Sequence, residues 1–146
     1  MTRLVVPPIV LALLAACGGA PESVVPAPAE PETAIREFMS AVADENLEDM
    51  AGLWGGERGP ALRYMDRNEL HQRLTVIQIY LEHERYDILP PGIQTAPEPS
   101  RRHYQVRIEN KGCRPVVPFT LIRYRGGWLV NSVDLGAVGN PAKRCN

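Results

Sequence analysis

Cys17 is the residue whose type and position best fit a defined chemistry. It directly follows the small residues Ala15 and Ala16, at the end of the apolar run Leu4–Leu14, which Arg3 precedes. A positive charge, an apolar stretch of this length and small residues at its end are typical of a secretory signal peptide. A spanning helix would need roughly 20 apolar residues. The sequence therefore predicts cleavage before Cys17, which leaves its thiol at the new N-terminus.

The tetrapeptide Leu14-Ala15-Ala16-Cys17 resembles the lipobox of bacterial lipoproteins, in which an aliphatic residue and two small residues precede a cysteine. The resemblance implies diacylation of the thiol and acylation of the new amino group. Two or three acyl chains anchor a protein stably, so the expected partner is a membrane that the chain does not cross. By resemblance to enterobacterial sorting, Gly18 predicts the outer membrane, facing the periplasm, rather than the inner membrane. The alternative is an ordinary secretory signal with an incidental cysteine.

The residues after Cys17 have the composition of a tether. Several prolines and a pair of glycines lie among alanines between Gly18 and Pro31. Such a segment cannot bury enough apolar area to order itself, and its prolines favour an extended spacer of roughly 40 Å. We therefore expect a signal peptide (1–16), a lipidated cysteine and tether (17–31), a single domain (32–136) and a C-terminal tail (137–146).

Two cysteines remain once Cys17 carries lipid. Exported domains commonly pair such residues, so Cys113 and Cys145 are predicted to form a disulfide that ties down the tail. Neither has a Cys-x-x-Cys partner or a nearby histidine, so the sequence predicts no metal site.

Acid–base catalysis would need a spaced pair of polar groups inside the fold. The candidates by residue type are His71, Tyr80, His83, His103, Tyr104 and Asp134. None of them forms a recognisable base-and-acid spacing, and neither a glycine-rich phosphate loop nor an HExxH motif occurs in the sequence. The sequence therefore predicts no catalytic residue and no cofactor.

The charges are segregated along the chain. Residues 22–57 contain nine acidic side chains against the single Arg36, whereas residues 100–146 contain nine basic ones against Glu109 and Asp134. Without Arg3, fifteen basic and seventeen acidic residues give a formal charge of −2, which argues against a nucleic-acid partner. The segregation indicates either two solvated faces or a surface for an anionic envelope partner. The candidate residues for that surface are Arg101, Arg102, Arg107, Arg123 and Arg125.

Helical periodicity dominates the first half of the predicted domain. Apolar residues recur every three or four positions in three segments that begin at Pro31, after Asn46 and after Asp66. In the third segment, Asp66 and Glu69 resemble a capping box. Its apolar stripe comprises Leu70, Leu74, Ile77 and Leu81, broadened by Val76 and Tyr80.

Strand signals dominate the second half. Short apolar or alternating segments cover 86–89, 104–108, 116–124 and 128–135, with Arg125-Gly126-Gly127 as a tight hairpin. Helices followed by an antiparallel meander predict an α+β domain with about three helices on one face of a curved sheet. Phe38, Trp54, Phe119 and Trp128 are predicted to lie in the core between them.

This order of elements resembles nuclear transport factor 2-like domains over roughly residues 31–136. The resemblance rests on the helical start at 31–38 and 46–54 and on the closing strand pair at 126–135. It implies a cone-shaped α+β fold with a pocket between helices and sheet. That family includes isomerases, dehydratases, binding modules and small lipoproteins, so the fold does not determine the function.

The leading hypothesis is therefore a membrane-anchored lipoprotein of the cell envelope with a non-enzymatic domain that binds a small apolar ligand or an envelope protein. One alternative is an enzyme of the isomerase or hydrolase type with a polar pair in the cone. Another is a structural accessory subunit of an envelope complex.

Overall fold

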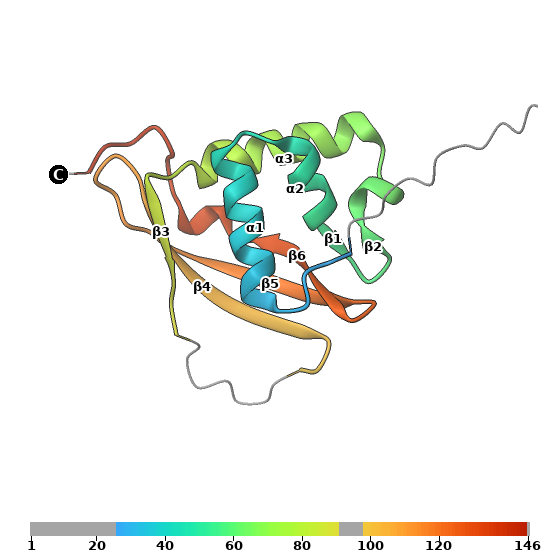
Figure 1. Ribbon diagram of the computed structural model, residues 1–146. Coiled ribbons are helices and arrows are strands. Elements are labelled where there is room, and N and C mark those ends of the chain that lie inside the picture. Colours follow the sequence, from blue (N-terminus) through green and yellow to red (C-terminus); the bar gives the residue numbers. More distant parts are fainter. Residues whose placement is uncertain (1–25, 91–97, 146) are drawn as a thin grey trace, which may run out of the picture.

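The computed structural model describes residues 26–90 and 98–145. Cys17, the predicted signal peptide and most of the predicted tether lie outside the described residues. Three α-helices and a four-stranded antiparallel sheet form an α+β fold, which confirms the predicted class. The helices lie together on one side of the sheet (Figure 1).

The helices are α1 (Pro31–Ala43), α2 (Leu47–Leu53) and α3 (Arg67–Leu81). Asn46 caps α2, as its position predicts, by accepting a hydrogen bond from the backbone N–H three residues later. Asp66 caps α3 by accepting from the N–H groups of Asn68 and Glu69 at 2.9 and 3.1 Å. The Glu69 carboxylate, which a capping box would direct back towards Asp66, instead accepts a hydrogen bond from Arg73.

The main sheet has the order β3-β4-β5-β6, with every neighbouring pair antiparallel. Its strands are β3 (Arg85–Ile88), β4 (Arg101–Glu109), β5 (Val116–Tyr124) and β6 (Gly127–Val133). Leu135, predicted to end the last strand, instead begins a short 3₁₀ turn, η2 (Leu135–Ala137). Arg125 and Gly126 form the predicted tight turn between β5 and β6, both with positive φ, as a two-residue hairpin requires.

A second, two-stranded ribbon follows α2. It consists of β1 (Gly55–Gly56) and β2 (Gly59–Pro60), and the 3₁₀ turn η1 (Ala61–Arg63) leads from it towards α3. Trp54, directly before β1, forms a parallel bridge with Val130 of β6. This bridge attaches the ribbon to the edge of the main sheet.

The core lies between the helices and the sheet. Phe38 and Phe119 are fully buried, while Trp54 and Trp128 are 8% and 5% exposed, which confirms the four aromatic residues as core. The predicted stripe of α3 is buried at Leu70, Leu74, Ile77 and Leu81. Val76 was predicted to broaden that stripe, but it is 48% exposed because its position turns away from α1 and α2.

Cys113 and Cys145 form a disulfide in the structure, as the sequence predicts. The bond joins the turn between β4 and β5 to the C-terminal tail. A backbone hydrogen bond from the Cys145 N–H to the Lys111 carbonyl, 3.0 Å long, lies beside it. The tail is therefore attached at the end of the sheet opposite to the β5–β6 turn (Figure 1).

Candidate functional site

Arginine side chains gather on aromatic rings where β5 turns into β6. The guanidinium carbons of Arg102 and Arg123 lie 5.4 and 5.9 Å from the ring centre of Trp128. Arg125, in the turn itself, lies 5.4 Å from the ring centre of Tyr124. We call this region the hairpin end. It comprises Arg58, Arg63, Arg102, Arg123 and Arg125 with the rings of Tyr64, Tyr124 and Trp128.

Strand register explains why two arginines share one tryptophan. Arg123 and Trp128 are directly opposite each other in the β5–β6 pair, so their side chains lie on the same face. The Arg123 N–H donates to the Ser100 carbonyl at 2.8 Å, which places the start of β4 alongside. Arg102, two residues further on, therefore reaches the same ring from the neighbouring strand.

The β1–β2 ribbon brings further arginines to the same end. Gly59 has φ of +102°, and a Cβ there would lie 2.7 Å from the Tyr124 ring, so only glycine permits this close approach. Arg63 then donates a hydrogen bond to the Tyr124 hydroxyl at 3.3 Å. Arg58 lies 4.1 Å above the Tyr64 ring. Sequence reasoning did not include Arg58 and Arg63, because their position depends on the contact of Gly59 with Tyr124.

The arginines of the hairpin end have no carboxylate partner among the described residues. The ion pairs among the described residues all involve other basic side chains: Arg36–Glu32, Arg73–Glu69, Arg85–Glu109, Lys111–Glu82 and Arg114–Glu109. Arg102 instead donates to the backbone carbonyls of Glu98 and Arg101. Arg58, Arg63, Arg123 and Arg125 are exposed. Exposed guanidinium groups held over aromatic rings can accept an external anion at little cost in ordering.

The structure divides the arginines that the sequence grouped together. Arg102, Arg123 and Arg125 meet at the hairpin end. Arg101 begins the same strand but is opposite Ile122, on the other face of the sheet, and its Nε is buried without a hydrogen-bond partner in the described chain. Arg107 lies further along β4, between Asp87 and Val116 in the register, and does not reach this end.

The candidates for acid–base chemistry are spread over separate places. His83 Nδ1 lies 2.9 Å from the Leu81 carbonyl at the end of α3, and His103 Nδ1 lies 3.1 Å from the Thr120 hydroxyl on an exposed part of the sheet. The Asp134 carboxylate caps η2. The interior described here contains no buried polar or charged side chain, so the polar pair that the enzymatic alternative requires is not found there.

Two tyrosines on the inner side of the sheet titrate at raised pH. Burial raises the pKa of Tyr104, and the negative charges of Glu32 and Glu30 act in the same direction. Burial also raises the pKa of Tyr86. Both phenols therefore remain neutral at physiological pH, and neither has the lowered pKa of an activated base.

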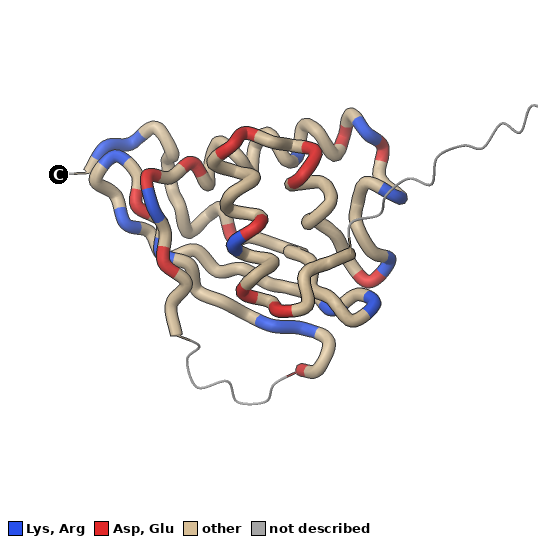
Figure 2. Tube along the Cα trace, viewed as in Figure 1, with Lys and Arg blue, Asp and Glu red and all other residues tan. Residues whose placement is uncertain are grey.

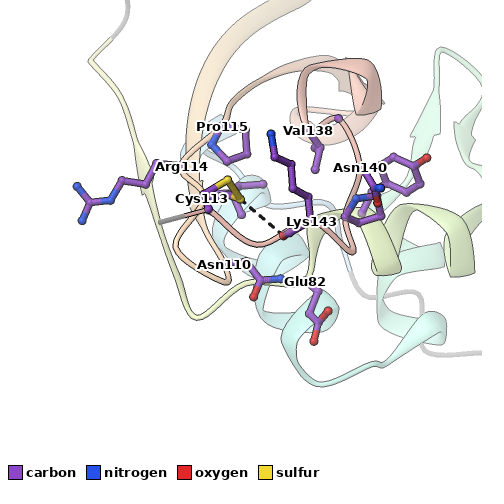
Figure 3. Close-up of a pocket in the computed structure, with 13 residues that line it drawn as sticks. Glu82, Asn110, Cys113, Arg114, Pro115, Val138, Asn140 and Lys143 are labelled. Carbon is purple, nitrogen blue, oxygen red and sulfur yellow. Dashed lines mark hydrogen bonds between the residues drawn. A yellow bond between two sulfur atoms is a disulfide. The ribbon is translucent and has the colours of Figure 1, made fainter.

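A first hollow of about 300 Å³ lies beside the disulfide (Figure 3). Its lining combines the end of α3, the β4–β5 turn and the C-terminal tail, and includes Tyr80, Glu82, Asn110 and Lys143. In the close-up, Arg114 points away from the other labelled side chains, and Glu82 points in another direction. The charged groups do not converge on one point, as a catalytic or anion-binding pocket would require.

A second, wider hollow of about 530 Å³ lies between the α1–α2 turn and α3. His71 lines it, together with the acidic Asp44, Glu45 and Glu48. Leu70 and Leu74 are among its lining residues but are 2% and 1% exposed, so its accessible apolar surface comes mainly from the half-buried Leu47 and Leu62, beside the acidic residues. The hairpin end is therefore the better candidate for a binding site.

Within residues 26–90 and 98–145, no helix combines the length and the apolar character that a membrane span requires. No family model and no curated protein matches the sequence. A solved structure described as the phospholipid-binding protein of Ralstonia solanacearum in complex with a phospholipid is similar in fold, with a TM-score of 0.41 and 11% sequence identity. The similarity covers 73% of this chain and 75% of that one. At this level the similarity implies nothing about a ligand of this chain.

Proposed function

We propose that the folded part of the chain is a non-enzymatic binding domain that takes an anionic ligand, bearing phosphate or carboxylate groups, at the hairpin end. The observation that carries this proposal is the set of arginines stacked on Trp128, Tyr124 and Tyr64 without carboxylate partners among the described residues. A guanidinium fork matches the geometry of both oxyanions and can bind them through two parallel hydrogen bonds.

We propose further that the protein is a lipoprotein of the bacterial cell envelope. Its lipobox-like segment predicts a lipid on Cys17, and Gly18 favours the outer membrane, facing the periplasm. The disulfide between Cys113 and Cys145 agrees with export to an oxidising compartment. In this arrangement residues 1–16 are the signal peptide, 17–31 join the anchor to the domain, and the disulfide attaches the tail 137–146.

We also propose that the domain has a cone-shaped fold of the nuclear transport factor 2-like kind. A cone-shaped, nuclear transport factor 2-like arrangement is supported by the order of elements, in which α1, α2 and α3 precede the β3–β6 meander. The irregularity in the β5–β6 register between Thr120 and Leu121 is the kind of feature that bends a sheet.

Retention on an immobilised phosphate resin tests the binding proposal. We expect the mature chain from residue 17, with Cys17→Ser, to bind phosphocellulose at low salt and to elute as salt shortens the Debye length towards roughly 3 Å at 1 M. Arg123→Gln with Arg125→Gln should lower the eluting salt concentration clearly, because both side chains are exposed at the hairpin end. Arg107→Gln with Arg144→Gln removes the same net charge away from the hairpin end and should change the eluting salt concentration little. Equal shifts for the two pairs would contradict a localised site.

Cys17→Ser in the full chain tests the anchor. We expect the variant to lose labelled fatty acid and either to leave the membrane fraction or to accumulate as an unprocessed precursor, because no thiol is available for acylation. Cell fractionation and metabolic labelling measure both effects. Label incorporated as strongly as in the wild type would place the lipid elsewhere.

A further inference from the structure

The N-terminal segment enters the fold beside the arginines of the hairpin end. The backbone N–H of Trp128 donates a hydrogen bond to the Pro28 carbonyl at 2.8 Å. A Cβ on Gly127 would lie 2.6 Å from the Cβ of Ala27, so the absence of a side chain at Gly127 allows this segment to lie against the hairpin. The guanidinium groups of Arg102 and Arg123 lie over the ring of Trp128. The chain therefore leaves the domain towards its N-terminus next to these guanidinium groups.

Covalent geometry limits how far this end can be from an N-terminal anchor. The segment Cys17–Val25 separates the proposed lipidated residue from Pro26, the first described residue. At a maximum of about 3.6 Å per residue, it spans roughly 32 Å in any conformation. Pro26 therefore stays within about this distance of the membrane surface, whereas the tail with the disulfide lies at the other end of the sheet (Figure 1).

The charge at this end suits an anionic surface. Figure 2 colours basic residues along the chain at both the β1–β2 ribbon and the β5–β6 turn. The acidic residues near this end include Glu30, Glu57 and Glu98 and also Glu32, which is paired with Arg36. A basic segment close to an anionic leaflet gains roughly fivefold in membrane partitioning for each arginine that reaches the surface. The anchor raises the local concentration further, so weak contacts suffice.

We infer that the hairpin end docks on the anionic phospholipid surface in which the protein's own anchor is embedded, and so fixes the orientation of the domain on the membrane. This inference rests on the proposed function, since it names the source of the anion that the arginines bind. It commits to lipid headgroups in a bilayer, as opposed to a free anion or an acidic envelope protein.

Vesicle sedimentation tests the inference. The mature chain with Cys17→Ser is mixed with phosphatidylcholine vesicles that contain or lack phosphatidylglycerol. We expect binding only to the vesicles with phosphatidylglycerol and a strong decrease as salt rises. Arg123→Gln with Arg125→Gln should reduce partitioning about 25-fold, following roughly fivefold for each arginine. The control pair, Arg107→Gln with Arg144→Gln, should bind within about twofold of the parent protein, because neither residue lies at the hairpin end.

Hydrogen exchange on the same vesicles reports the orientation. We expect slower exchange of the backbone amides at Arg125 and Gly126, which form the turn, when phosphatidylglycerol vesicles are present. The amides of the tail near Cys145 should exchange at an unchanged rate. Protection of the tail without protection of the turn would overturn the inference.

The remaining outcomes separate this inference from the proposed function. Retention on phosphocellulose without binding to phosphatidylglycerol vesicles would overturn the membrane as the source of the anion and leave the anion site in place. Absence of both phosphocellulose retention and vesicle binding would overturn the proposed anion site as well as the inferred docking on the membrane. Equal binding to vesicles with and without phosphatidylglycerol, or equal weakening by the two variant pairs, would show that the arginines of the hairpin end do not direct docking.

Discussion

Leu74→Ala is expected to lower the free energy of unfolding by about 2–5 kcal/mol, the usual cost of truncating a buried leucine. Leu74 is 1% exposed and lies in the middle of the buried stripe of α3, with Leu70 and Ile77 on either side. The lost methyl groups would leave space that neighbouring side chains can fill only in part. Urea denaturation followed by circular dichroism measures this loss as a lower midpoint at an unchanged slope.

Val76→Ala is the matched control in the same helix. Val76 is 48% exposed, so its truncation removes little buried area. Alanine also has a higher helix propensity than valine, by a few tenths of a kcal/mol. We therefore expect a midpoint equal to or slightly above that of the wild type. If Leu74→Ala and Val76→Ala had similar effects, the buried face of α3 would be assigned incorrectly.

Local sequence signals account for most of the elements. The recurrence of Leu70, Leu74, Ile77 and Leu81 predicts the buried face of α3 because these positions follow the turn of a helix. The alternation of Tyr104, Val106 and Ile108 likewise predicts which side of β4 packs on the helices. These features depend on neighbours a few residues apart, so a single sequence contains enough information for them.

Val76 shows where local patterns fail. Its spacing is compatible with the apolar stripe, yet a helix that packs on one side buries only a narrow arc, and Val76 falls outside that arc. The sequence patterns do not predict the β1–β2 ribbon, for a different reason. Its strands are two residues long, and its attachment depends on the bridge between Trp54 and Val130, far apart in the chain.

The candidate site was predictable only in part. The sequence identifies Arg102, Arg123 and Arg125 as basic residues near strand ends, but it cannot give the register that places two of them over Trp128. Arg107 alternates with the apolar residues of β4. This alternation assigns its side chain to a face of the sheet but does not say which end of the sheet it lies near. Which residues share an end of a sheet is set by pairing between strands, which is a long-range property.

The contact of Pro28 with Trp128 joins the segment that would lead to the proposed anchor to the proposed binding site. The prolines and alanines before α1 predict a spacer, and the structure places two of these residues, Ala27 and Pro28, against β6. If Cys17 carries lipid as proposed, this attachment keeps the arginines of the hairpin end close to the point at which the chain leads to the lipid.

Removal of the disulfide by Cys113→Ala with Cys145→Ala is expected to lower the free energy of unfolding by roughly 3–4 kcal/mol. The bond closes a loop with a sequence separation of 32 residues, and cross-linking a loop of this length removes a corresponding amount of conformational entropy from the unfolded chain. The loop contains β5, β6 and η2, so the effect should extend over the sheet.

The slope of the unfolding free energy against urea concentration distinguishes an effect on the unfolded chain from a loss of native contacts. Without the cross-link, the unfolded chain expands and exposes more surface, so the slope in urea should rise while the midpoint falls. Leu74→Ala, which acts on the folded core, should leave the slope unchanged. Reduction of the wild-type protein should reproduce the behaviour of the double variant. An unchanged free energy of unfolding in both would mean that the tail gains no stability from its attachment at Cys113, and that its contacts near Lys111 are sufficient to hold it in place.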